Sequence, residues 1–294
     1  MMNNCAVKYI TYFSTLLLYV QCTTTPPAAT FSPAFAKYWM SGNAEVNTYR
    51  LENMRYGEMR QGDAVLIFVT EELSNAKQVK LDNAEGIRES EKTRVLKLNR
   101  IQKFKTGIYD YSMMQSVFTP IQQAASTMKT TTTIQEWCGQ TFLQCNLKNN
   151  MYHFGGYSYF EQEGDQKFSL PMHLLEDELW TRLRLAPDKL PIGKTPIITG
   201  AFYTQLAHTP IGIEQATLTM IADSTAQTLT LQYSNNRVLK IVTEKTFPFK
   251  IMMWEEWQNN NLTARATLRS SRQIPYWQMN KNQNATWRDT LGLN

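Results

Sequence analysis

The sequence predicts a mainly β fold: one large antiparallel sheet, curved or partly closed into a barrel, with one amphipathic helix packed on it and a short C-terminal helix. From Glu45 onward, β-branched and aromatic residues recur in short alternating runs separated by turn residues. This pattern is typical of strands joined by tight turns. The regular spacing of the runs favours a meander over a parallel sheet with crossover helices.

In the first half of the chain, residues 59–70 are expected to form a hairpin whose turn is Gln61-Gly62-Asp63. Further alternating runs predict strands, and the last two of them are joined by a turn at Lys148-Asn149-Asn150. These runs are 94–104, 108–118, 130–147 and 151–162.

Residues 172–185, "MHLLEDELWTRLRL", carry the amphipathic helix pattern. Leu175, Leu179 and Leu183, with Trp180, form the apolar stripe that should face the sheet. The polar positions between them should face water, namely Glu176, Asp177 and Arg184.

The second half of the chain returns to alternating runs, which predict strands at 195–208, 213–222, 227–234, 237–245, 249–257 and 262–271. The final segment 284–294 predicts a short helix with Asn284 as its N-cap.

Composition excludes some classes of protein. With 294 residues, 43% hydrophobic and 12% aromatic, the chain can bury a large core. The formal charge of +5 comes from 30 basic and 25 acidic side chains spread along the chain, without a basic run. We therefore expect no nucleic-acid partner.

The N-terminus is typical of an export signal. One cation, Lys8, precedes an apolar run from Ile10 to Val20, and Cys22 follows. The run is shorter than the roughly 20 residues that cross a bilayer, and it fits a signal peptide. We expect residues 1–22 to be a lipoprotein-type signal with cleavage before Cys22 and lipidation of that thiol. Cleavage after "PPAA" (26–29) is the alternative, because Gln21 is not small.

This interpretation gives a domain organisation and a location. Residues 23–33 would be a flexible tether, since they are polar and interrupted by prolines, and residues 34–294 a single β-rich domain. The protein would be exported and anchored to a membrane of the cell envelope through its lipid, in the outer membrane and facing the periplasm.

The segment "QEWCGQTFLQC" (135–145) resembles a redox motif, but the spacing argues against one. Thioredoxin-type pairs have two residues between their cysteines, whereas Cys138 and Cys145 are seven positions apart. In a continuous strand their Cα atoms would be about 23 Å apart, far beyond disulfide reach. Both thiols are expected to be packing residues, with Cys145 in a core-facing row that includes Trp137; a bend at Gly139 is the alternative that would allow a bond.

No cofactor or metal is expected. The three histidines, His153, His173 and His208, lie on different predicted elements, so their spacing leaves a three-histidine zinc site open, but histidines scattered in this way are usually surface or core residues. Carboxylates in or beside strands leave a hydrolase open as an alternative. They are Glu136, Glu161, Glu163, Asp165, Glu255 and Glu256.

Aromatic residues gather on two groups of strands. Trp137, Tyr157, Tyr159 and Trp254 are the candidate ligand-binding residues. A curved sheet with an aromatic wall beneath a helix could hold an apolar or lipid-like ligand.

Several segments carry a resemblance to a known family. They are "RYGEMRQGDAVLIFVTEE" (55–72), "TGIYDYSMMQSVFTP" (106–120), "QEWCGQTFLQ" (135–144), "SYFEQEGD" (158–165), "LLEDELWTRLRL" (174–185) and "PYWQMNKN" (275–282). The chain resembles, over nearly everything after Tyr38, a family of uncharacterised exported bacterial proteins, mostly predicted lipoproteins. Cys145 departs from that family, where an apolar residue is expected.

Members of the family are often labelled as septum formation inhibitors of the Maf type, which are cytoplasmic nucleotide pyrophosphatases. That label does not fit here, because the Ser-x-Ser-Pro-Arg-Arg start of the Maf enzymes is absent and the chain begins with an export signal. In shape, the expected sheet with a helix on it is similar to periplasmic half-barrel carriers of lipids and lipoproteins. Shape alone implies no activity.

The sequence thus predicts a non-enzymatic envelope lipoprotein that binds an apolar or lipid-like ligand, or an envelope protein partner. Two alternatives remain: a periplasmic hydrolase that uses strand carboxylates or a histidine, and a structural subunit of an envelope complex.

Overall fold

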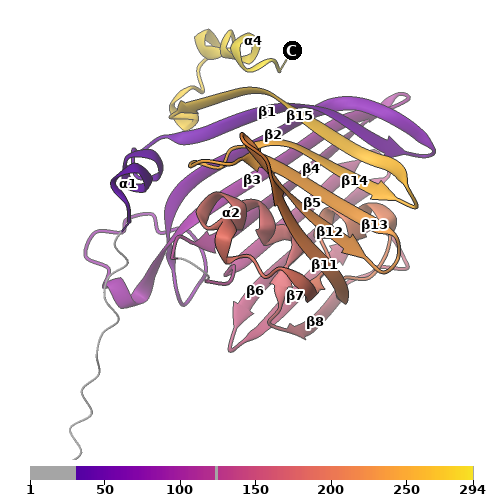
Figure 1. Ribbon diagram of the computed structural model, residues 1–294, viewed down its shortest axis with the longest axis horizontal. Coiled ribbons are helices and arrows are strands. Elements are labelled where there is room, and N and C mark those ends of the chain that lie inside the picture. The colour runs from indigo at the N-terminus through magenta and orange to yellow at the C-terminus, as the bar shows by residue number, and fades with distance from the viewer. Residues whose placement is uncertain (1–30, 123–124, 294) are drawn as a thin grey trace, which may run out of the picture. The chain divides into compact units, whose positions relative to one another are not determined.

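A single curved sheet dominates the part of the chain that the computed structural model describes, residues 31–122 and 125–293 (Figure 1). It has 15 strands, and every neighbouring pair is antiparallel except β9 and β10. No ladder joins the two edge strands within these ranges, so the sheet stays open. The predicted fold class is confirmed.

The strands are β1 (Ala44–Arg55), β2 (Glu58–Ser74), β3 (Lys92–Thr106), β4 (Tyr109–Pro120), β5 (Lys129–Glu136), β6 (Gly139–Lys148), β7 (Met151–Ser158), β8 (Gln166–Pro171), β9 (Leu174–Leu175), β10 (Gly193–Ile198), β11 (Ile213–Ala222), β12 (Ala226–Tyr233), β13 (Arg237–Glu244), β14 (Ile251–Gln258) and β15 (Asn261–Ile274). The α-helices are α1 (Pro33–Trp39), α2 (Leu179–Leu185), α3 (Ala201–Ala207) and α4 (Trp287–Leu291).

The first and last strands meet in the middle of the sheet, where Ala44 of β1 pairs with Ile274 of β15. From there one meander runs outward through β2 to the edge strand β8, and the other runs back through β14 to the edge strand β9. Because the strands alternate in direction, the turns at Tyr56–Gly57 and Asn259–Asn260 lie at the same end of the sheet as α3. We call this end the turn end.

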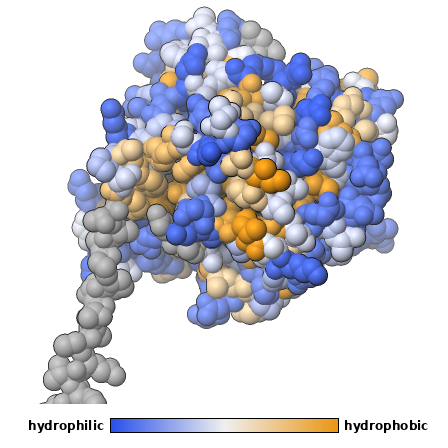
Figure 2. Space-filling view, viewed as in Figure 1, coloured by the Kyte–Doolittle hydropathy of each residue, from blue (hydrophilic) through white to orange (hydrophobic). Residues whose placement is uncertain are grey.

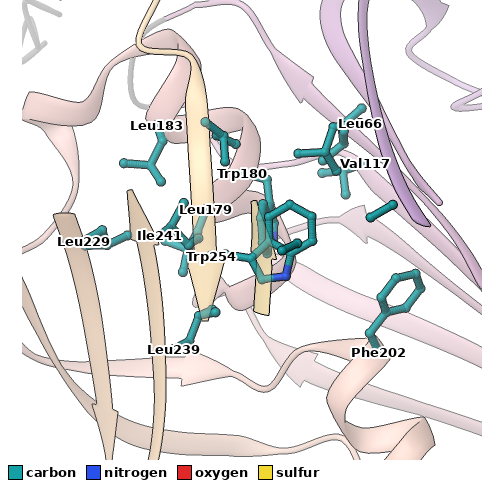
Figure 3. Packing of buried hydrophobic residues seen from close by; sticks show 14 of the residues in the cluster. Leu66, Val117, Leu179, Trp180, Leu183, Phe202, Leu229, Leu239, Ile241 and Trp254 are labelled. Atoms are coloured by element: carbon teal, nitrogen blue, oxygen red, sulfur yellow. The ribbon is translucent and has the colours of Figure 1, made fainter. Parts of the chain in front are cut away.

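Helix α2 lies against the concave face of the sheet (Figure 1). Its apolar side chains Leu179, Trp180 and Leu183 are fully or almost fully buried among strand residues such as Trp254 and Ile241, as Figure 3 shows. The predicted apolar stripe is therefore present, although the α-helix is shorter than 172–185 and follows the one-turn 3-10 helix Glu176–Glu178.

The prediction that the polar residues of this segment face water is wrong. Glu176, Asp177 and Arg184 are 5%, 7% and 0% exposed. The sheet curves around the helix, so the polar side chains lie inside and are paired there. Arg184 donates two hydrogen bonds of 2.6 Å to the carboxylate of Glu45 on β1. Burial alone would raise the pKa of Glu45, but Arg184 holds it below its ordinary value.

The chain ends of the domain cover two further surfaces. Helix α1 packs Phe35 and Trp39 into the main core. The C-terminal segment packs Tyr276 and Leu291 against the opposite face of the sheet, over β1 and β2. The short C-terminal helix is confirmed, but its N-cap is Thr286 and not Asn284, which ends a preceding 3-10 turn.

The predicted hairpin turn at Gln61-Gly62-Asp63 is wrong. These residues lie inside β2, and the turn is at Tyr56–Gly57, where both residues have positive φ. Gly62 serves close packing: a Cβ there would meet the backbone oxygen of Lys103 at 2.1 Å. A glycine inside a strand often marks such an approach.

The predicted continuous strand 130–147 is also wrong. It is the hairpin β5–β6, which turns at Trp137 and Cys138. Trp137 and Cys138 are therefore exposed and do not belong to the core-facing row, whereas Cys145 is buried as predicted. Both cysteines are free thiols. The predicted turn at Asn149–Asn150 is confirmed.

The predicted strand 195–208 is half strand and half helix. It is β10 followed by α3, which starts after Gly200 and ends at His208 in a left-handed conformation. The helix buries Ala201, Phe202 and Thr204.

Most of the surface seen in Figure 2 is hydrophilic, with hydrophobic residues showing between the polar ones. Residues 1–22, with the predicted lipidation site Cys22, and most of the predicted tether 23–33 lie outside the described residues. Phe31, near the end of that tether, stacks on Phe35 of α1 at 4.8 Å between ring centroids.

Candidate functional site

A cavity of about 350 Å³ lies at the turn end, between α3 and the concave face of the sheet. Polar and charged residues form one part of its lining: Asn53, Arg55, Arg100, Gln102, Tyr203, Arg237, Glu256, Gln258 and Thr263. Apolar residues form the rest: Met54, Phe202, Leu206, Ala207, Trp257 and Ala264. We call it the arginine cavity.

Strand alternation places the central arginine. In β3 the buried, concave-facing positions are Leu96, Leu98, Arg100, Gln102 and Phe104, which follow one another at every second residue. Since side chains of a strand alternate between faces, Arg100 points to the same side as the core leucines. The strand therefore directs a cation into a row of mostly apolar side chains.

Arg100 is a buried guanidinium with little hydrogen bonding. It is 4% exposed, and its Nε has no hydrogen-bond partner among the residues that the structure describes. Oε1 of Glu256 lies 3.7 Å from Nη2, an ion-pair distance that is too long for a hydrogen bond. Burial lowers the pKa of Arg100, against the raising effect of Glu256, but a guanidinium stays protonated in proteins.

Aromatic rings hold this guanidinium in place. Its Cζ lies 4.2 Å from the ring centroid of Trp180, 4.7 Å from that of Phe202 and 5.4 Å from that of Trp254. Cation–π attraction is strongest when the cation is desolvated. The rings fix the position of Arg100 without occupying its hydrogen-bond donors.

The second buried arginine, Arg237, is in contrast hydrogen-bonded through both of its Nη groups, although its Nε, like that of Arg100, has no partner among the described residues. It donates hydrogen bonds of 2.5 and 2.7 Å to Glu176 and one of 3.2 Å to Glu256, and it stacks on Tyr203 at 3.8 Å. Burial alone would lower the pKa of Arg237, but the two carboxylates raise it well above its ordinary value. Glu176 and Glu256 are therefore the counter-charges of Arg237.

Asp177 lies beside this pair and anchors α3. Both of its carboxylate oxygens accept from the backbone N–H of Ala201, at 3.1 and 3.2 Å. Burial, and next the charge of Glu176, raise the pKa of Asp177 to about 7. Gly200 allows the close approach, because a Cβ there would meet Oε1 of Glu176 at 2.3 Å.

The rim of the cavity ties the other end of α3 to the sheet. Arg55 on β1 donates a hydrogen bond of 2.6 Å to the backbone oxygen of Leu206 and one of 3.1 Å to the hydroxyl of Tyr111. Its guanidinium also stacks on the ring of Tyr56, which is 60% exposed in the β1–β2 turn. Helix α3 is thus held at both ends.

The structure does not bring the four predicted ligand-binding residues together. Trp254 is fully buried in the core, beside Trp180 and Arg100. Trp137, Tyr157 and Tyr159 are 68%, 51% and 68% exposed and do not line the arginine cavity; Tyr157 lies on the other side of α3.

A second cavity, of about 290 Å³, lies on that side, between α3 and strands β6 to β8. Tyr157 is in its lining, as are His208 and Glu163, whose Nδ1 and Oε1 atoms are 2.7 Å apart, a hydrogen-bond distance.

The predicted catalytic carboxylates are dispersed. Glu136 accepts from the N–H of Cys138 in an exposed turn. Glu255 pairs with Arg265, and Glu256 alone lines the arginine cavity. Over residues 31–122 and 125–293, no group of three or more His, Cys, Asp and Glu side chains is placed to hold a metal ion.

The arginine cavity was not predicted from the sequence, although two features of the sequence point to it. One is Arg100 at an inward position of a predicted strand, in "LKLNRIQKF". The other is "EDE" (176–178), which has two apolar residues directly on each side, Leu174-Leu175 and Leu179-Trp180. The partners of these residues come from strands far away in the chain, and no local pattern reveals them.

No family model, curated protein or solved structure matches this chain. Among the described residues, no helix is both long enough and apolar enough to cross a membrane.

Proposed function

We propose that this chain is an exported, lipid-anchored protein of the cell envelope that has no enzymatic activity and binds a small amphipathic ligand in the arginine cavity. The export signal and the anchor at Cys22 are proposed from the sequence of residues 1–22. The ligand is proposed from the cavity.

One observation carries the proposal: a cavity of about 350 Å³ in which buried polar groups converge beside apolar side chains. Ligand sites are largely apolar, with a few fixed polar groups that orient the ligand. The volume lies at the lower end of the usual range of roughly 300–1,000 Å³. It suits one short chain or one ring, and it is too small for a lipid with two acyl chains.

The test is binding of eight-carbon amphiphiles with different head groups, measured by calorimetry and thermal shift on the protein without its signal. A variant that fills the mouth of the cavity, Ala207→Trp, should lose binding of every amphiphile. The matched control is Ala222→Trp, an exposed position at the end of β11, which should bind normally. If no amphiphile binds the wild type, or if both variants bind as the wild type does, the proposed function is wrong.

The anchor needs a separate test. Cells grown with a clickable fatty acid should label the wild type and leave Cys22→Ala unlabelled, with the variant released from the membrane fraction. Equal labelling of both proteins would show that Cys22 is not the lipidated residue.

A further inference from the structure

We propose, resting on the proposed function, that the ligand of the arginine cavity is an organic anion whose acidic head group, a carboxylate or a phosphate, is bound by the guanidinium of Arg100. Its short apolar part would lie along the apolar lining of the cavity.

The first argument is charge. Arg100 and Arg237 are both buried, and the nearby carboxylates Glu176 and Glu256 are hydrogen-bonded to Arg237. A buried charge is costly unless it is paired and hydrogen-bonded. The only carboxylate within ion-pair distance of Arg100 among the described residues is that of Glu256, at 3.7 Å, and this carboxylate also accepts a hydrogen bond from Arg237. The two arginines and two carboxylates balance in formal charge, but no carboxylate in the described part of the chain lies within hydrogen-bonding distance of Arg100. An anionic ligand would supply that hydrogen-bonding partner.

Asp177 does not supply a hydrogen-bonding partner for Arg100 either. It faces the same cluster, but its two oxygens accept from the N–H of Ala201 and its pKa is raised to about 7 by burial and by Glu176. Near and below neutral pH, much of Asp177 is therefore protonated and neutral. Arg55, on the rim, adds a further positive charge to the lining.

The second argument is geometry. A guanidinium offers a planar fork of donors that matches a carboxylate or phosphate. The Cζ of Arg100 lies over two rings, that of Trp180 at 4.2 Å and that of Phe202 at 4.7 Å. Its Nε is buried and has no protein partner among the described residues, so the ligand would be met by the Nη groups. Aromatic packing therefore holds the fork ready, in a side chain that lines the cavity.

The third argument is the apolar lining. Met54, Leu206 and Ala264 lie in the same cavity as the arginine. A free inorganic anion would leave this surface without a partner, whereas a short alkyl or aryl acid would cover it. Burying apolar surface contributes to affinity in addition to the ion pair.

The first experiment compares probes of equal chain length on the wild type: octanoate and octyl phosphate as anions, and 1-octanol as the neutral probe. We expect at least one of the anions to bind at least tenfold more tightly than 1-octanol. Equal binding of all three would overturn the anion inference and leave the proposed function standing. Binding of none would refute both. Which anion binds more tightly identifies the head group.

The second experiment uses Arg100→Gln, with Arg94→Gln as its matched control. Both arginines are on β3, but Arg94 pairs with Glu72 at the surface. We expect Arg100→Gln to weaken binding of the preferred anion at least tenfold, which corresponds to the loss of a hydrogen bond to a charged group. The affinity for 1-octanol should stay unchanged within about twofold. Arg94→Gln should bind both probes as the wild type does.

An unchanged anion affinity in a folded Arg100→Gln protein would overturn the assignment to Arg100. If this variant does not fold, the comparison of head groups on the wild type still decides between an anionic and a neutral ligand.

Discussion

Replacing Asp177 with Asn tests the electrostatics of the buried cluster. The folded carboxyl has a pKa of about 7, against an ordinary value of 3.8 that applies to the unfolded chain. Between these values the folded chain binds more protons than the unfolded chain. Stability must therefore fall as the pH rises through this window and level off above the folded pKa.

The magnitude follows from these two values, 3.8 and about 7. A tenfold change in proton affinity corresponds to about 1.4 kcal/mol. Integrated from about pH 5 to about pH 8, the contribution of Asp177 lowers the free energy of unfolding by about 2.5 kcal/mol. Asn is neutral throughout and can still accept from the N–H of Ala201 through its Oδ1, so Asp177→Asn should lack this contribution.

Urea unfolding of both proteins at the two pH values is the assay. From about pH 5 to about pH 8, the free energy of unfolding of the wild type should fall by about 2.5 kcal/mol more than that of Asp177→Asn. Glu178, whose pKa burial also raises, is present in both proteins, so its contribution cancels in the difference. Asp188→Asn is the control, because Asp188 is exposed, and it should follow the wild type. If the gap between wild type and Asp177→Asn is the same at both pH values, the argument for a neutral Asp177 is wrong.

Three further predictions concern packing and reactivity. Glu45→Gln leaves the buried guanidinium of α2 without its counter-charge, so urea unfolding should show a loss of about 3–5 kcal/mol; a loss below about 1 kcal/mol would contradict the pairing. Gly62→Ala should lower the free energy of unfolding by about 1–3 kcal/mol, because the new Cβ would meet a backbone oxygen of β3. Gly155→Ala is the control and should leave the free energy of unfolding nearly unchanged, because the space around its Cβ is open. Equal effects of the two substitutions on urea unfolding would refute the packing argument. Iodoacetamide should modify Cys138 in the folded protein and Cys145 only after unfolding, as mass spectrometry can show, because the first thiol is exposed and the second is buried; rapid native labelling of the second would contradict its burial.

Helix α3 is the element that makes the candidate site. With seven residues, it is far shorter than the roughly 12–15 residues at which isolated helices become stable. Asp177 holds its first turn, and Arg55 binds the carbonyl of Leu206 near its end. The helix separates two cavities, of which the one with buried arginines is the stronger candidate for a ligand site.

Local residue patterns determined the strands. Residues 213–222 were predicted from alternation, and β11 has those bounds. The turn at Asn149–Asn150 was equally readable, because asparagine tolerates positive φ. The amphipathic stripe of Leu179 and Leu183 was correct as well. Each of these features depends on residues that are close in the chain, so periodicity or turn residues alone predict it.

Tertiary structure alone decided what surrounds those elements. No local pattern indicates that α2 is buried on every side. Glu176 and Arg184 were therefore expected to face water, but they are buried in ion pairs. The partners of Glu176 and Arg184 are 61 and 139 positions away in the chain. The surroundings of Arg100, which place aromatic rings beside its guanidinium and no carboxylate of the described residues within hydrogen-bonding distance, likewise come from other strands and helices. Burial and charge pairing depend on contacts between distant segments, and such contacts exist only once the sheet has curved around its helices.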